Sequence, residues 1–159
     1  MIELLTYKPV LIGLHLGFAV LGIDGFVWLM GELLSSPGNK VRMKYASWIG
    51  ISGFALSWLA GGYYYVVYYG TLVKPVIKSG LAPWAHAIVM EAKEHIFIFI
   101  LPVAITAVLA ALANDDIRAK LGAGKETIKL VGLVAALGLI IGAMGFIISA
   151  AARWGVLQP

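Results

Sequence analysis

The chain contains three histidines, and they are the residues best suited to chemistry. His15 stands in the stretch Gly-Leu-His-Leu-Gly, His95 ends the charged stretch Glu-Ala-Lys-Glu-His, and His86 precedes His95 by nine residues. A neutral imidazole can bind a metal or carry a proton. The sequence has no cysteine, which excludes disulfides, zinc bound by cysteine, iron–sulfur clusters held by this chain and covalent attachment of c-type haem. The chemistry must therefore come from imidazoles and carboxylates.

The elements that must position these residues are apolar helices. Of the 159 residues, 61% are hydrophobic and 13% are charged, and the mean hydropathy is +0.93, as in membrane proteins. Four apolar segments are long enough to cross about 30 Å of hydrocarbon at about 1.5 Å per residue. They cover residues 9–31, 46–69, 84–113 and 128–152, separated by a Ser-Ser-Pro-Gly turn at 35–38, a loop from 71 and a charged connection from 114. The sequence predicts one domain over 1–159, an all-α integral membrane four-helix bundle of up-down-up-down topology.

The basic residues predict how the bundle is oriented. The two connections on one side of the predicted bundle carry seven lysines and arginines, and the opposite side carries five. Because basic loops stay in the cytoplasm, we expect both termini outside, in a prokaryotic inner membrane. The same loops account for the net charge of +4, so we expect no nucleic-acid partner. The predicted partners are the lipid bilayer and other subunits of a membrane complex.

Counting residues along the helices gives the depth of each histidine. His95 lies 18 residues from Ala113, about 27 Å along the third segment, and His15 lies 17 residues from Glu32, about 25 Å along the first. The two imidazoles are therefore predicted at nearly the same level, just inside the outer boundary. Two imidazoles on facing helices can bind one iron from opposite sides. We predict His15 and His95 as the metal ligands of a b-type haem.

A haem also needs room and partners for its propionates. Glycines at the same level, which would let a porphyrin approach the backbone, are Gly13, Gly17, Gly62 and Gly145. Such glycine spacings commonly serve helix packing alone, which is the alternative interpretation. Lys93 and Arg153 are the basic residues placed to meet propionates.

Candidates for proton transfer are His86, Glu91, Glu94 and Asp24. Nine helical residues rotate His86 about half a turn from His95, so the two cannot share one metal, and an exposed interfacial histidine is the ordinary interpretation. Glu91 precedes His95 by four residues and could orient its imidazole. Solvation at the interface is the alternative for these carboxylates. Asp24 is predicted to lie deeper in the membrane. It could be a proton-relay group, or it could cap a kink in the helix near Gly22 and Gly25.

In outline, with His15 and His95 as candidate ligands, the chain resembles the four- or five-helix haem-bearing anchor subunits of respiratory dehydrogenases. The resemblance implies electron transfer between a quinone or quinol and a partner redox protein, as a subunit of an oxidoreductase complex and not as an enzyme by itself. It also implies a quinol site among Tyr63, Tyr64, His86 and the two nearby carboxylates.

Two other functions remain open on the sequence. The chain could be a cofactor-free structural or assembly subunit of a larger membrane respiratory complex, with its glycine faces bound to partner helices. It could also be a metal or proton transporter that uses Asp24 and the histidines, although no matched halves with broken helices are visible. The Glu-x-x-His pairs of a di-iron bundle are absent.

Overall fold

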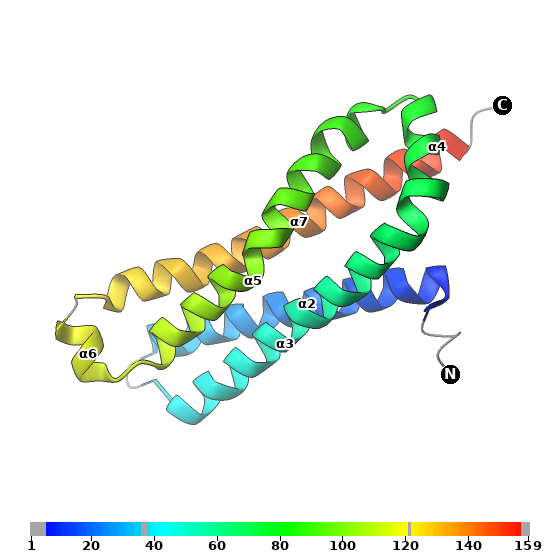
Figure 1. Ribbon diagram of the computed structural model, residues 1–159. Helices are drawn as coiled ribbons and strands as arrows, with labels where there is room; N and C mark the ends of the chain where they lie inside the picture. The colour runs from blue at the N-terminus through cyan, green and yellow to red at the C-terminus, as the bar shows by residue number, and fades with distance from the viewer. Residues whose placement is uncertain (1–5, 36–37, 121, 157–159) are drawn as a thin grey trace.

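The computed structural model describes residues 6–35, 38–120 and 122–156, and every element in these ranges is helical. Figure 1 shows their arrangement. In chain order they are α2 (Lys8–Leu34), α3 (Lys40–Tyr64), the π-helix η1 (Tyr65–Val73), α4 (Lys74–Ser79), the π-helix η2 (Ala85–Met90), α5 (Glu91–Leu112), α6 (Asp115–Lys120) and α7 (Gly124–Val156). Within these ranges, three helices are long and apolar enough to cross a membrane: Lys8–Leu34, Ala85–Leu112 and Gly124–Val156.

The predicted second span differs from the other three. Residues 46–69 are helical, but α3 does not reach the apolar character of the three spanning helices, because glycine, serine, tryptophan and tyrosine interrupt its apolar residues. The predicted loop from Thr71 is wrong: the helix continues through η1 and α4 to Ser79. Pro75 does not stop it: the proline lies where the π-helical η1 gives way to α4, and the chain remains helical across this point.

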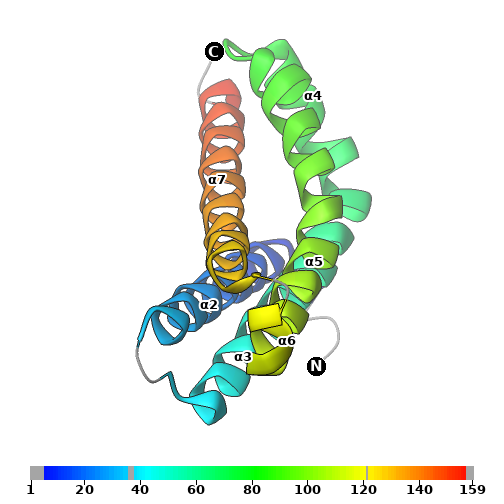
Figure 2. The same ribbon diagram turned by 90° about the vertical axis from the view of Figure 1, so that its left-hand side faces the viewer.

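The long helices pack in a ring. Each of α2, α3, α5 and α7 makes its main contacts with two of the others, and consecutive long helices run in opposite directions in Figure 1. α2 begins and α7 ends at one end of the molecule, and α6 lies at the other end. Figure 2, which looks from the α6 end, shows α4 at the far end, where α7 finishes. The candidate site residues are distributed over several of these helices.

Glycines set the closest helix contact. A Cβ atom on Gly25 would lie 2.5 Å from the Cα of Gly50 and 2.8 Å from the carbonyl oxygen of Ala46, and a Cβ on Gly53 would collide with the backbone of Gly22. No side chain larger than hydrogen fits there, so α2 and α3 meet backbone to backbone. The main apolar core lies beside this contact and includes Phe26, Leu29, Phe54, Ile100, Val131 and Val134.

A second apolar cluster lies at the α4 end. Its buried members come from η1, α4, η2 and α7: Tyr69, Val73, Ile77, Ala82, Ala85, Met90, Ile148 and Ala151. The outward faces of the helices are also apolar, with Leu16, Ile98, Phe99, Leu109, Leu139 and Phe146 among the exposed side chains. Such faces suit contact with lipid.

The α6 end is held by charged contacts. The buried carboxylate of Glu32 accepts hydrogen bonds from Trp28 Nε1 at 3.0 Å and from the backbone N–H of Asn39 at 3.3 Å, and it pairs with Arg42 Nε at 2.8 Å. Asn39 in turn caps α3 by accepting from two backbone N–H groups. These contacts fix the turn between α2 and α3.

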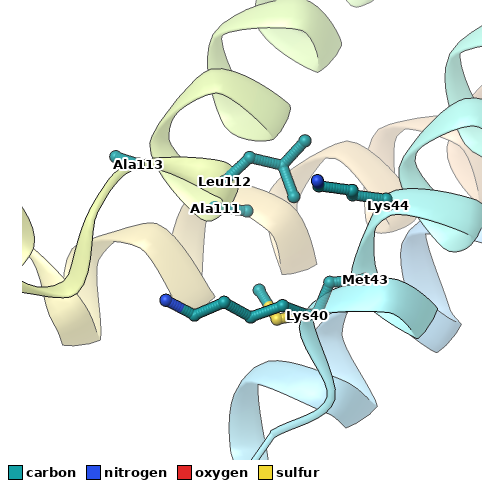
Figure 3. Close-up of a pocket in the computed structure, with 6 residues that line it drawn as sticks. All are labelled: Lys40, Met43, Lys44, Ala111, Leu112 and Ala113. Atoms are coloured by element: carbon teal, nitrogen blue, oxygen red, sulfur yellow. The ribbon is translucent and has the colours of Figure 1, made fainter.

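A small cavity also lies at the α6 end. Figure 3 shows it between Lys40, Met43 and Lys44 of α3 and residues 111–113 at the end of α5. Its volume is about 40 Å³, which suits a water molecule and not an organic cofactor. A wider hollow beside it is lined by residues from α2, α3, α6 and α7, and no histidine lines either one.

Candidate functional site

The His15 side chain joins α2 to α3. Its Nδ1 lies 2.9 Å from the backbone carbonyl oxygen of Ser57 and 3.0 Å from Ser57 Oγ, which itself donates to the His15 carbonyl at 2.9 Å. A carbonyl oxygen only accepts, so Nδ1 carries the hydrogen and Nε2 carries the lone pair. The ring lies against Gly61, where a Cβ would stand 2.5 Å from Nδ1. His15 is therefore fixed in position and in tautomer.

His95 has the same tautomer on a different surface. Its Nδ1 lies 2.6 Å from the backbone carbonyl oxygen of Glu91, one turn earlier in α5, and the side chain is exposed. Nδ1 must again donate, which leaves Nε2 as a free lone pair. No residue in the described parts of the chain hydrogen-bonds Nε2 of either His15 or His95.

The structure brings Phe97, and not His95, to His15. The ring centroids of His15 and Phe97 are 6.3 Å apart in an edge-to-face arrangement, and Trp58 stacks on Phe97 at 5.9 Å. Two residues along a helix correspond to a rotation of about 200°, so His95 points away from the side of α5 that meets His15. The counting of residues predicts height along a helix but contains no information on this rotation.

The predicted propionate partners lie in different environments. Lys93 is half-buried and turns toward α7, where its Nζ would stand 3.3 Å from a Cβ on Gly145. The lysine therefore occupies the space that Gly145 leaves. Arg153 is exposed in the last turn of α7.

The other predicted clearance glycines are open. A Cβ on Gly13, Gly17 or Gly62 would meet nothing within 4 Å. These three glycines therefore do not serve packing within the chain, and space beside them is available to lipid, to another subunit or to a cofactor.

His86 lies in a buried polar cluster, so the expectation of an exposed histidine is wrong. Its side chain is 6% exposed, Nδ1 lies 3.0 Å from the Tyr69 hydroxyl, and Nε2 lies 3.9 Å from Oε1 of Glu91. The reason is that α3 continues through η1 past residue 71, which brings Tyr69 back against η2. The Glu91 side chain consequently faces His86, and its contact with His95 is made by its backbone carbonyl instead.

The tyrosines of this cluster are not the predicted ones. Tyr65 and Tyr69 stack with ring centroids 5.2 Å apart, and the Tyr69 hydroxyl lies at hydrogen-bonding distance from His86. By contrast, Tyr63 is exposed, and Tyr64 packs against the ring of Tyr68. The spacing of four between residues 65 and 69, which puts both on one helix face, is the signal that sequence reasoning missed.

Glu94 is distinctive among the described residues. Its Oε1 atom is the buried side-chain oxygen or nitrogen in those ranges that has no hydrogen-bond partner. Buried polar atoms are normally paired, so an unpaired one marks a place where a ligand or water is accommodated. Asp24 is the opposite case: it is exposed on α2, although its neighbours Gly22 and Gly25 are buried against α3.

Known proteins do not identify the site. No family model, no curated protein and no solved structure matches the chain. Within the described ranges, no group of three or more histidine and carboxylate side chains is close enough to hold a metal ion. A haem differs from a bare ion because the porphyrin supplies four nitrogen ligands and needs only axial ligands from the protein.

Proposed function

We propose that the chain is a b-type cytochrome subunit of a membrane electron-transfer complex, carrying electrons between a quinol and a partner redox protein. In this proposal the helices form an up-down-up-down transmembrane bundle in a prokaryotic inner membrane, with both termini outside. The observation that carries the proposal is the hydrogen bond from His15 Nδ1 to the Ser57 carbonyl, inside an apolar helix pair.

That hydrogen bond is the contact that a ligating histidine normally makes. Metal-bound imidazoles donate their second nitrogen to a carbonyl or carboxylate, which fixes the ring and directs the other lone pair at the metal. His15 and His95 both have this arrangement, whereas His86 Nδ1 lies 3.0 Å from the Tyr69 hydroxyl and its Nε2 lies 3.9 Å from the Glu91 carboxylate. The proposal therefore assigns haem ligation to His15 and His95, and assigns proton transfer to His86.

The haem, when bound, would supply the one-electron chemistry that this chain's side chains lack. His15 would hold it from α2, and Lys93, with Arg153 nearer to water, would bind its propionates. Phe97 now occupies the side of α5 that meets His15. His15 and His95 could therefore bind one iron only if α5 rotated about its axis. For this reason, ligation by His15 is tested independently of ligation by His95.

A visible spectrum of the purified chain, recorded as reduced minus oxidised, tests the proposal. We expect Soret and α bands that are lost in His15→Ala and are changed to those of a singly ligated haem in His95→Ala. His86→Phe is the matched control and keeps the bands, because the buried His86 ring faces Tyr69 and Glu91 and is not assigned as a haem ligand. Absence of bands in the wild-type chain would refute the haem, and bands that survive His15→Ala would refute the ligand assignment.

A second function is favoured by the way His15 is packed. Its ring is held by Ser57 and covered by Gly61 and Phe97, so α2 and α3 are clamped together without any cofactor. This arrangement would suit a structural or assembly subunit of a membrane complex. In that case the purified chain shows no Soret band, and His15→Ala lowers only its stability.

A further inference from the structure

We infer that Tyr69, His86 and Glu91 form a proton relay that leads from the second apolar cluster to the water at the α4 end of the molecule. The three groups come from η1, η2 and the first residue of α5, and they follow one another from buried to exposed. The inference extends the proposed function, which requires an exit for the protons of a quinol, but its geometry does not depend on haem.

The inner step joins a phenol to an imidazole. The Tyr69 side chain is 2% exposed and lies among apolar residues of η1, α4, η2 and α7, where its hydroxyl has His86 Nδ1 at 3.0 Å. The two rings also contact each other, with centroids 5.9 Å apart. Because the other buried residues of this cluster are apolar, the His86 imidazole is the hydrogen-bond partner of the Tyr69 hydroxyl, with Nδ1 at hydrogen-bonding distance.

The outer step joins the imidazole to a carboxylate at the surface. His86 Nε2 lies 3.9 Å from Glu91 Oε1, and the Glu91 side chain is 50% exposed. In the relay, Nδ1 accepts the Tyr69 hydrogen and Nε2 carries the hydrogen that faces the carboxylate, which is the opposite tautomer to that of His15 and His95. Because 3.9 Å is longer than a hydrogen bond, the relay requires one water or a small rotation of the glutamate at this step.

The proton balance needs no oxidant. Nδ1 takes the phenolic proton of Tyr69 while the Nε2 proton passes to Glu91, and Glu91 then releases it to water. Tyr69 is restored by a proton from inside the protein, and the imidazole turns back to its first tautomer. Tyr65 stacks on the ring of Tyr69, and Glu94 carries a buried oxygen that has no hydrogen-bond partner among the described residues. A quinol hydroxyl bound there is the proton source that the proposed function provides.

The local backbone also differs from an ordinary helix. Both η1 and η2 are π-helical, and π-turns inside helices are frequent at functional sites. The contact between Tyr69 and His86 joins these two π-helical segments. A purely structural hydrogen bond would hold the same two segments together but would not connect the buried hydroxyl to water.

The rate at which the Tyr69 hydroxyl exchanges with water separates these two interpretations. The chain, labelled with ¹³C at the Cζ of tyrosine and reconstituted in lipid nanodiscs, is placed in equal parts of H₂O and D₂O. A hydroxyl that exchanges slowly gives two resonances, one for OH and one for OD, and a hydroxyl that exchanges fast gives one averaged resonance. Tyr69→Phe assigns the signal.

We expect one averaged resonance in the wild-type chain and an exchange rate at least tenfold lower in His86→Phe. Glu91→Gln also slows exchange, and because Glu91 is half-exposed this variant keeps the fold if the larger change at His86 does not. Glu126→Gln, the same change at an exposed carboxylate that pairs with Lys129 near the start of α7, leaves the rate unchanged. Two resonances in the wild-type chain, or an unchanged rate in both relay variants, would overturn the relay. The haem spectrum is recorded separately, so failure of the proposed function is distinguishable.

Discussion

Gly61 and Gly62 are adjacent, and substituting each of them by alanine tests whether the His15 contact is as tight as described. A Cβ on Gly61 would stand 2.5 Å from Nδ1 and 2.7 Å from Cε1 of the His15 ring, whereas a Cβ on Gly62 would meet nothing within 4 Å. Both glycines lie within α3, so both variants gain the same helix propensity, about 1 kcal/mol. This gain cancels when the two variants are compared.

The expected difference follows from the contacts that Gly61→Ala breaks. To avoid the new methyl group, the imidazole must leave Ser57, whose carbonyl and hydroxyl both lie within 3.0 Å of Nδ1. Losing hydrogen bonds to a half-buried ring costs about 1–3 kcal/mol. We therefore expect Gly62→Ala to be more stable than Gly61→Ala by about 1–3 kcal/mol.

Reversible unfolding of the two variants in mixed detergent micelles measures this difference in the free energy of unfolding. The ¹⁵N shifts of His15 provide a second measurement, because they report whether Nδ1 still carries the hydrogen in a fixed hydrogen bond. Equal stabilities, together with unchanged His15 shifts in Gly61→Ala, would show that the ring does not lie against Gly61.

Two further predictions concern the fold. Glu32→Ala removes the carboxylate that accepts from Trp28 Nε1 and pairs with the largely exposed Arg42, so it should lower the free energy of unfolding by about 1–3 kcal/mol. Glu126→Ala, which breaks an exposed pair with Lys129, should cost less than about 1 kcal/mol in the same assay. Gly25→Ala inserts a methyl group into the contact between α2 and α3 and should lower the free energy of unfolding by about 1–3 kcal/mol. Gly31→Ala, where a Cβ meets nothing within 4 Å, should not destabilise the chain. Equal unfolding midpoints for the two variants would contradict the close helix contact.

The membrane character of the chain could be predicted from the sequence because it depends on composition and length alone. Long apolar segments must be helical in lipid, since every backbone group needs an internal partner. The same reasoning missed the continuation of α3 past Thr71. It expected a loop there, whereas the helix continues through η1 into α4, which carries Pro75 near its start.

The candidate site could be predicted only in part, for a geometric reason. The sequence gives the height of a residue along its helix, so the selection of His15 and His95 at one level was accessible. Which residues face each other depends on the rotation of each helix about its axis. That rotation places Phe97 against His15 and turns His95 outward. It is set by contacts such as the fit of the His15 ring on Gly61, which leave no periodic signal in the sequence.

His86 was selected from the sequence as a proton-transfer candidate, but its burial was missed for a related reason. We expected an exposed side chain because His86 stands near the start of an apolar segment, where water is expected. Its burial depends on Tyr69, 17 residues earlier, which is brought back by the continuous helix through η1. Tertiary contacts of this kind become visible only when the connection between two helices is placed correctly.

The central claim is that the lone pair of His15 Nε2 binds haem iron, and imidazole rescue of a His15→Gly variant tests it most directly. The substitution removes the side chain that Ser57 orients and leaves a space of imidazole size. We expect the wild-type chain to show reduced Soret and α bands, His15→Gly to lose them, and added imidazole to restore them in the variant. A wild-type chain without these bands, or a His15→Gly variant that keeps them without imidazole, would contradict the claim.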